Sequence, residues 1–372
     1  MLDNKRGLSA IIITVIMIGL ALAAIALVWV VVSNLINDEL ENASAGLSKV
    51  ILDVDKVEIT NDGVEVKVTR NAEAGDLEMI KFRFNNKDDS YSVDKIVELG
   101  PGDSKTYSFN FEDIKADYFS EVTIAPMLKV NEDGEPRLYD ITDKYELTNK
   151  QIVSSIGAVP ISWWRFEGDA NDEMGKNDLI FVETGASYTE GDYGQALEIE
   201  NNQFSSELKD AKIGDEYSIV LSFISESDYT NPDMFIKLRN SDNTYKRVFL
   251  ITGSSPLGSA LRFDDGGDSG KIISSNKYVK DSGWEVAVAT AIKGVVTGQE
   301  DNLYLGGVVT PGSVDATATF NDNLNKIYLG EVGFPFEGKI DEVMIFDKAL
   351  IVDEGNGINQ IENLQKFMES LK

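Results

Sequence analysis

Oxygen-bearing side chains gather in one acidic turn of this sequence, and they are the residues best suited to bind an ion. Asp169, Asn171 and Asp172 lie close together, and Asp341 follows far along the chain. Carboxylates and amides are the ligands that a hard cation such as Ca²⁺ takes from proteins. The EF-hand template does not fit, because methionine stands where that loop needs glycine and isoleucine where it needs glutamate. The alternative is that these aspartates cap a turn and hydrogen-bond backbone amides.

Catalytic residues are not expected. The chain contains no histidine and no cysteine, which removes imidazole and thiolate mechanisms together with the usual zinc, haem and disulfide sites. A glycosidase of this fold needs two carboxylates on one face of a strand. The segment that comes nearest to this pattern is Glu167-Gly168-Asp169. The glycine and the turn residues after it break that strand. The sequence therefore predicts that the protein is not an enzyme, and a glycoside-active enzyme is the remote alternative.

The charge balance narrows the range of partners. Among 372 residues, 63 are acidic and 34 are basic, which gives a formal net charge of -29. A chain this acidic repels phosphate backbones and anionic lipid headgroups. We therefore expect no nucleic-acid partner.

An apolar segment near the N-terminus decides where the later domains lie relative to a membrane. Residues 8–32 are almost purely aliphatic, and 25 residues in a helix at about 1.5 Å each are enough to cross a hydrocarbon core of about 30 Å. A cleaved secretory signal has a shorter apolar region, of about 7 to 15 residues. Lys5 and Arg6 precede the segment, so we expect the N-terminus in the cytoplasm and the later domains outside.

The stretch KRGLSAIIIT resembles the class III signal of archaeal type IV pilins and archaellins. In those families a prepilin peptidase cuts after a glycine that follows basic residues, and the apolar helix stays in the mature subunit. The matching positions are Lys5, Arg6, Gly7 and Leu8. The resemblance implies a cytoplasmic leader over residues 1–7 and a cut between Gly7 and Leu8. It departs from bacterial pilins, which carry a glutamate where this chain has Ile12.

Small residues in the apolar segment allow close helix packing, so we expect self-assembly through this helix. Trp29 is bulky for such a bundle. The alternative is an uncleaved anchor that does not polymerise. The helical pattern continues beyond the membrane, which predicts a helix and stalk over residues 8–49. Asn42 begins the glycosylation sequon Asn-Ala-Ser in this stalk.

Residues 50–150 alternate apolar and polar side chains in short runs separated by turn signals. VDKVEIT and VEVKVTR flank Asn61-Asp62-Gly63, and GPGD at positions 100–103 marks another turn. About seven strands in about 100 residues are typical of a small immunoglobulin-like β-sandwich. The run NKQIVSSIGAVP at 149–160 marks the next boundary.

Residues 160–372 read as many short strands with glycine-rich turns, followed by the amphipathic helix IENLQKFMESL. Five segments occur in order: SWWRFEGDANDEMGKNDLIF, YTEGDYGQALEIENNQ, SGWEVAVATA, NLYLGGVV and GKIDEVMIFDKAL. Together they resemble the laminin G-like, concanavalin A-like jelly roll. The resemblance implies that the first and last strands pair in one sheet. We expect Trp163 or Trp164, Phe166, Trp284 and Phe346 in the core, with a lectin-like aromatic platform as the alternative.

The same resemblance implies a structural calcium ion where the acidic turn after the first strand meets the last strand. Asp169, Asn171, Asp172 and Asp341 are the matching ligands. The fold class is therefore mainly β: a transmembrane α-helix, a small sandwich and a jelly roll.

The order of these parts predicts a protein in the cell membrane, held by residues 8–32, with extracellular C-terminal domains or a place in a surface filament. Its jelly roll would serve adhesion or recognition of a glycan or a surface protein. The alternative is a tethered structural protein of the cell envelope.

Overall fold

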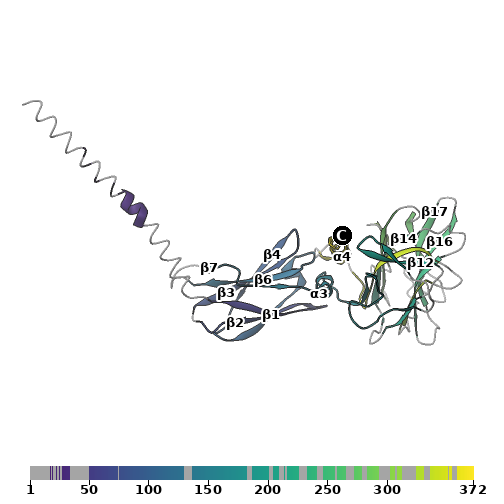
Figure 1. Cartoon of the computed structure of the whole chain (residues 1–372), viewed down its shortest axis with the longest axis horizontal. Coiled ribbons are helices and arrows are strands. Elements are labelled where there is room, and N and C mark those ends of the chain that lie inside the picture. The colour runs from purple at the N-terminus through teal and green to yellow at the C-terminus, as the bar shows by residue number, and fades with distance from the viewer. Residues whose placement is uncertain are drawn as a thin grey trace, which may run out of the picture.

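The protein is mainly β and consists of two successive β units that follow an N-terminal helical segment (Figure 1). The structure is a computed structural model. It describes the following residues: 17, 19, 22, 25, 27–33, 50–73, 75–129, 136–181, 187–200, 204–208, 213, 216–225, 233–240, 246–255, 258–264, 272–278, 283–292, 302–305, 308–311, 324–330, 336–350, 352–353 and 358–372.

Two sheets form the first unit, which we call the sandwich. One sheet has the order β1-β2-β5 and the other β4-β3-β6-β7, with β8 also paired to β6. The strands are β1 (Leu52–Thr60), β2 (Gly63–Arg70), β3 (Leu77–Asn85), β4 (Ser90–Ile96), β5 (Ser104–Phe109), β6 (Glu121–Leu128), β7 (Arg137–Leu138) and β8 (Asp143–Glu146). A short helix, α2 (Phe111–Ile114), follows β5.

Alternation along the strands builds the core of the sandwich. In β2, Val64, Val66 and Val68 are fully buried while the residues between them face outward. They pack with aromatic rings of both sheets; for example, the ring centroids of Phe82 and Phe109 lie 4.8 Å apart in an edge-on arrangement. Such alternation is the signature of an antiparallel sheet with one covered face. The predicted hairpin is confirmed, since Thr60 pairs with Gly63 across Asn61 and Asp62.

The sandwich has two distinct ends. At its N-terminal end, the Ile51 carbonyl accepts the Asn71 N–H and the Leu52 N–H donates to Thr142 Oγ1. At its opposite end, which we call the junction end, Asn61 Oδ1 accepts the Val159 N–H. Strand β1 runs from the first end to the second, so the strands lie along the line that leads to the second β unit (Figure 1).

The second unit, which we call the outer domain, contains two large antiparallel sheets. One has the order β10-β13-β22-β15-β16-β17-β18, with β10 (Ile180–Phe181), β13 (Phe204–Glu207), β22 (Leu324–Leu329), β15 (Asp233–Asn240), β16 (Lys246–Ser255), β17 (Gly258–Asp264) and β18 (Ile272–Tyr278). The other has the order β11-β12-β23-β14-β19-β20-β21, with β9 also paired to β23. Its strands are β9 (Pro160–Trp164), β11 (Ser187–Glu190), β12 (Gln195–Glu200), β14 (Glu216–Ser225), β19 (Glu285–Ile292), β20 (Asn302–Leu305), β21 (Val308–Pro311) and β23 (Glu337–Phe346). A small ribbon pairs β24 (Val352–Asp353) with β25 (Ile358–Asn359).

The second of these sheets is buried on both faces at its centre. Strands β14 and β23 have nearly continuous runs of buried residues, as a strand covered on both sides requires. Adjacent side chains on a strand point to opposite faces, so Trp164 packs in the core between the two sheets and Trp163 packs on the other face. Both rings are fully buried.

Two helices cover the outward face of that sheet beside the sandwich. They are α3 (Asn149–Ser154) and α4 (Gln360–Ser370). Thr148 caps α3 through a reciprocal pair with Gln151. The apolar side of α4 contributes Leu364, Phe367 and Met368, which are buried against the sheet.

One aromatic contact joins the two units through α4. The Phe367 ring lies 5.8 Å from the Trp163 ring of the outer domain and 6.1 Å from the Tyr118 ring of the sandwich. Gln360 Nε2 donates to the Gly157 carbonyl at 2.6 Å, and Lys366 Nζ lies 2.6 Å from Asp117 of the sandwich. The C-terminal helix therefore packs across the junction.

The pairing of the outer domain's end strands and the burial of its aromatic residues were both predicted from the sequence. The first strand of the outer domain pairs with the last, since Val343 faces Trp164 and Met344 faces Trp163. Phe166 and Phe346 are core residues as predicted. Trp284 is only half-buried, so its predicted place in the core is wrong. It lies just before β19, where strand pairing begins at Glu285, and its ring is covered only in part.

Candidate functional site

Polar residues converge at the centre of the outer domain, where the first strand meets the last. Strand β23 pairs with β12 as far as Ile340 and with β9 from Val343 onward. On its other side, Ser222 pairs with Asp341 while Leu221 pairs with Val343. Glu342 is therefore the extra residue of a β-bulge. We call the polar residues around it the bulge cluster: Trp163, Arg165, Glu167, Asp341 and Glu342.

The backbone at Glu342 is unusual. Its φ is +40°, in the left-handed region that side chains other than glycine rarely adopt. Bulges re-aim a side chain out of the regular strand pattern. Here the bulge places two successive acidic residues, Asp341 and Glu342, in fully buried positions.

Glu342 is held by two donors from the first strand and the residue after it. Its Oε1 accepts from Arg165 Nε at 3.0 Å, and its Oε2 accepts from the indole N–H of Trp163. Arg165 also lies over the Trp163 ring, 5.5 Å from the centroid. A buried carboxylate is tolerated when it is paired and hydrogen-bonded in this way.

Burial has the largest effect on the pKa of Glu342. Loss of water raises the pKa of Glu342 to about 8, although Arg165 and the Trp163 N–H act in the opposite direction. Burial also raises the pKa of Asp341 to about 6, against the backbone N–H groups that bind it. Both carboxyl groups therefore hold a proton more tightly in the folded chain than carboxyl groups in water do.

Asp341 fixes the β11–β12 turn. Its Oδ2 accepts the N–H groups of Asp192 and Tyr193 at 2.9 and 2.8 Å. Its Oδ1 is buried without a hydrogen-bond partner among the described residues. Glu167 binds the same turn, since its Oε2 accepts the Gln195 N–H at 3.1 Å. A Cβ at Gly194 would lie 2.0 Å from Glu167 Oε1, so this close approach requires glycine.

Asp172 organises the acidic turn after β9. Its carboxylate accepts four backbone N–H groups, those of Trp163 (2.8 Å), Met174 (3.0 Å), Lys176 (3.3 Å) and Asn177 (3.0 Å). The residue is buried. Such a carboxylate substitutes for a strand partner and closes the turn.

The four predicted calcium ligands thus fall into three separate arrangements. Asp172 binds its own turn, Asp341 binds the β11–β12 turn, and the exposed Asp169 binds the backbone N–H and side-chain amide of Asn171 at 3.1 and 2.7 Å. Across the described ranges, no three acidic side chains gather in a way that could hold a metal ion. These contacts match the alternative in which the aspartates bind amides, and calcium binding stays a prediction.

The segment Glu167-Gly168-Asp169, which comes nearest to a glycosidase carboxylate pair, does not lie on a strand. Strand β9 ends at Trp164, and Gly168 has a φ of +87°. Glu167 faces Arg165 at 3.2 Å while Asp169 binds Asn171. The arrangement orders the backbone, and Glu342, which has no exposed surface, pairs with Arg165.

Glu342, Arg165 and Asp192 were not predicted as site residues. The available signal was the Asp-Glu pair inside the apolar strand GKIDEVMIF, because two adjacent charges in a buried strand each need a partner. The Arg165 side chain that serves Glu342 lies 177 positions away, and no local pattern connects them.

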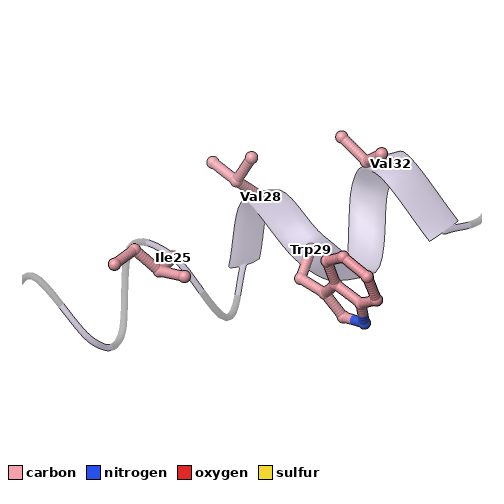
Figure 2. A pocket seen from close by; sticks show the side chains of 4 residues that line it. All are labelled: Ile25, Val28, Trp29 and Val32. Atoms are coloured by element: carbon pink, nitrogen blue, oxygen red, sulfur yellow. The ribbon is translucent and has the colours of Figure 1, made fainter.

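The N-terminal helical segment presents apolar side chains. Ile25, Val28, Trp29 and Val32 line a shallow surface groove on it, and Figure 2 shows these four side chains projecting from the helix. Among the described residues, no helix combines the length and apolarity needed to cross a membrane. Lys5, Arg6, Gly7, Leu8 and Asn42 lie outside the described residues.

No protein-family model matches the sequence, and no curated protein matches it. Solved structures similar to the chain include domain 4 of AbnA, an extracellular GH43 arabinanase from Geobacillus stearothermophilus, in complex with arabinotriose. That alignment has 16% identity and a TM-score of 0.43, and it covers 57% of this chain and 98% of that domain. The binding domain of botulinum neurotoxin DC in complex with SialylT aligns at 12% identity and a TM-score of 0.44, over 57% of this chain and 51% of that one. The chain thus spans about half the length of the neurotoxin domain.

Proposed function

We propose that the chain is a membrane-anchored, pilin-like protein of the cell surface that displays its outer domain for adhesion or recognition. Within this proposal the sandwich is immunoglobulin-like and the outer domain is a laminin G-like jelly roll. The observation that carries the proposal is the exposure of apolar side chains on the N-terminal helical segment. Ile25, Val28 and Trp29 are 64%, 62% and 71% exposed.

These side chains do not form one stripe. The described part of the segment is apolar on every side, apart from Gly19 and Ser33, because residues 27–32 cover more than a full turn of helix. A helix that covers a soluble core is apolar on one face only, whereas a helix that is apolar all round belongs in lipid or among other helices. The apolar sequence is 25 residues long, which is enough for a helix to span a bilayer. Within this proposal the helix lies in lipid first and packs against other helices later.

The sequence supplies the orientation and the processing step of this proposal. Lys5 and Arg6 keep the N-terminus in the cytoplasm and leave both β units outside. A peptidase that cuts between Gly7 and Leu8 releases a short leader and leaves the apolar helix in the chain. The alternative is a tethered envelope protein with an uncut N-terminus.

Vesicle flotation tests the anchor. The full chain is reconstituted with zwitterionic phospholipid vesicles and centrifuged through a density gradient, and we expect it to rise with the lipid. The double variant Val28→Lys/Trp29→Lys is expected to rise much less, because each lysine within a spanning helix costs about 2.5 to 3.5 kcal/mol. Ile180→Lys, at a site that is 69% exposed in the outer domain, is the matched control and should float like the wild type. A wild-type chain that stays at the bottom would contradict the anchor.

A glycan array tests recognition by the outer domain. The full chain in detergent is applied with calcium and again with a chelator. Retention on a defined class of glycans supports recognition, and a need for calcium supports the predicted ion. If no glycan is retained in either condition, a protein ligand or the structural role is favoured, and glycan recognition is abandoned.

A further inference from the structure

An apolar row crosses the outer face of the β4-β3-β6-β7 sheet. Ile96 pairs with Met79, Met79 pairs with Met127, and Met127 pairs with Leu138. Directly paired residues of neighbouring strands point to the same face, so the four side chains stand side by side. Ile96 is 81% exposed and Leu138 is 43% exposed, and the two methionines are half-buried.

The row faces away from the sandwich core. The next residue along β3, Ile80, is fully buried in that core, and side chains alternate along a strand. The row also lies at the N-terminal end of the sandwich, because Met127 and Leu138 are at the end of the sheet where β1 begins. Apolar side chains that gather on a solvated sheet face mark an interaction surface.

Charged residues of both signs lie on the same face. Strand β4 presents Asp94, β3 presents Lys81 and Arg83, and β6 presents Glu121. Beyond β6, β8 presents Lys144 and Glu146, which form an ion pair at 2.6 Å within one copy. Lys81 and Asp94 form an ion pair at 2.7 Å within one copy.

We propose that this face binds a second copy of the same chain around a two-fold axis that runs along the strands. Rotation about such an axis reverses the order of the strands across the face. Ile96 of one copy then meets Leu138 of the other, and Met79 meets Met127. The same rotation sets Arg83 opposite Thr123 and diagonal to Glu121, and it sets Lys144 opposite Ser92 and diagonal to Asp94. The apolar row is therefore self-complementary, and long charged side chains of opposite sign lie on diagonals beside it, as an isologous interface allows.

The axis keeps both N-termini at one end of the pair. Strand β1 runs from the N-terminal end to the junction end, and rotation about the strand direction preserves that sense. Two copies held in one membrane would meet in this orientation at a raised effective concentration. This last point rests on the proposed anchor, whereas the complementarity of the face does not.

A lipid surface fits the face less well than a second copy does. A bilayer would cover the apolar row but would also bring Asp94 and Glu121 against headgroups and hydrocarbon. In the pair, each of these carboxylates lies diagonally across from a lysine or an arginine of the other copy. Charges of both signs at defined positions favour a protein partner of matching pattern.

Cysteine cross-linking tests the pair cleanly because the chain contains no cysteine. Full-length Ile96→Cys with one tag is mixed with full-length Leu138→Cys with another, in vesicles, and treated with a short bismaleimide. We expect the mixed cross-link to exceed by several-fold the product of a control pair, Glu65→Cys with Thr106→Cys, on the outer face of the β1-β2-β5 sheet. A yield equal to the control would overturn the proposal.

Flotation of the same samples separates this proposal from the anchor. Floated protein without the mixed cross-link refutes the paired face and leaves the anchor intact. If the protein does not float, the cross-link is measured in solution, where its presence supports the face and its absence refutes it. A second variant, Ile96→Asp/Leu138→Asp, changes exposed side chains only, so circular dichroism should stay unchanged while the wild-type cross-link between two other sites on this face, Ser92→Cys and Lys144→Cys, is lost.

Discussion

At the scale of single residues, buried carboxylates organise the centre of the outer domain. Asp172 closes the turn after the first strand, Asp341 holds the β11–β12 turn, and Glu342 joins the last strand to Arg165 and Trp163. Asp172 and Asp341 accept backbone N–H groups where regular strand pairing stops, and Glu342 accepts side-chain N–H groups. Their role is positional, because the groups they bind belong to the backbone and to neighbouring side chains.

The stability of the outer domain should depend on pH through Glu342. Its pKa is about 8 in the folded chain against an ordinary value of 4.5, so the folded state binds the proton more tightly than the unfolded state. The stabilisation is complete below pH 4.5 and is lost as the pH rises through 8. Asp341, whose pKa is about 6, adds a similar loss at lower pH. We therefore expect the melting temperature to fall between pH 6 and 8.5 mainly because of Glu342.

Glu342→Gln should flatten that fall, because glutamine keeps the shape and cannot ionise. Each kcal/mol lost lowers the melting temperature of a domain of this size by about 2 to 4 °C. The change in tryptophan fluorescence on melting reports on the outer domain, since Trp163, Trp164 and Trp284 lie in it, the sandwich has none, and the fourth tryptophan, Trp29, is already 71% exposed. Glu337→Gln, at an exposed position of the same strand, is the control. If the melting temperature falls equally steeply with pH in Glu342→Gln and in the wild type, Glu342 is not the group responsible.

Asp172→Ala should destabilise the outer domain by about 3 kcal/mol, because a charge-assisted acceptor is lost and buried N–H groups stay unpaired. Asp169→Ala, which removes only an exposed contact, should cost less than about 1 kcal/mol. Melting in millimolar calcium and in chelator completes the comparison, since a ligand that binds only the folded state must stabilise it. A calcium-dependent rise that Asp169→Ala abolishes would establish the predicted ion. Equal losses in the two variants would contradict the account of Asp172.

At the scale of elements, the central sheet of the outer domain has two covered faces. The sheet β10-β13-β22-β15-β16-β17-β18 covers one face, and α3 and α4 cover much of the other. This explains why β14 and β23 are apolar in sequence at consecutive positions. It also explains why both tryptophans of SWWRF are buried, where a strand with one covered face would bury only one.

Removing one ring from α4 should loosen the junction. Phe367 is 1% exposed and contacts both Trp163 and Tyr118, so Phe367→Ala should cost about 3 to 5 kcal/mol of unfolding free energy. We expect calorimetry to resolve separate transitions for the sandwich and the outer domain in this variant. Lys366→Ala removes two exposed ion pairs, with Asp117 and Glu362, and should cost less than about 1 kcal/mol. If Phe367→Ala melts like Lys366→Ala, the helix does not couple the two units.

Local patterns in the sequence were sufficient for much of the fold. The Asn61-Asp62-Gly63 hairpin and the C-terminal helix were predicted from such patterns, whereas the pairing of the first and last strands of the outer domain was implied by the family resemblance. Turn chemistry and side-chain alternation are local, and so they can be read from neighbours in the chain.

The bulge cluster could not be predicted in the same way. The bulge at Glu342 and its contact with Arg165 depend on strand register, which is decided by tertiary pairing. The acidic turn after the first strand was singled out correctly as a polar centre. Spacing alone does not show whether its carboxylates face an ion or a backbone N–H. Helix α3, by contrast, lies within the stretch interpreted as a domain boundary, and its capping residues Thr148 and Gln151 were the missed signal.

At the scale of the whole molecule, an apolar helical segment precedes two β units that are packed together through α3 and α4 (Figure 1). In the proposed function, this order displays the outer domain away from the membrane. The net charge of -29 keeps the exposed units soluble and disfavours contact with anionic surfaces. The paired face at the N-terminal end of the sandwich would bring anchored copies together without covering the outer domains.

The intact mass of the chain extracted from the membranes of cells that make it tests the central claim most directly. The claim is that a leader is cut from an apolar helix that then stays in the mature protein. We predict a mass that lacks residues 1–7, with Leu8 at the N-terminus. A chain that begins at Met1 would contradict the pilin-like function and leave only the uncut anchor.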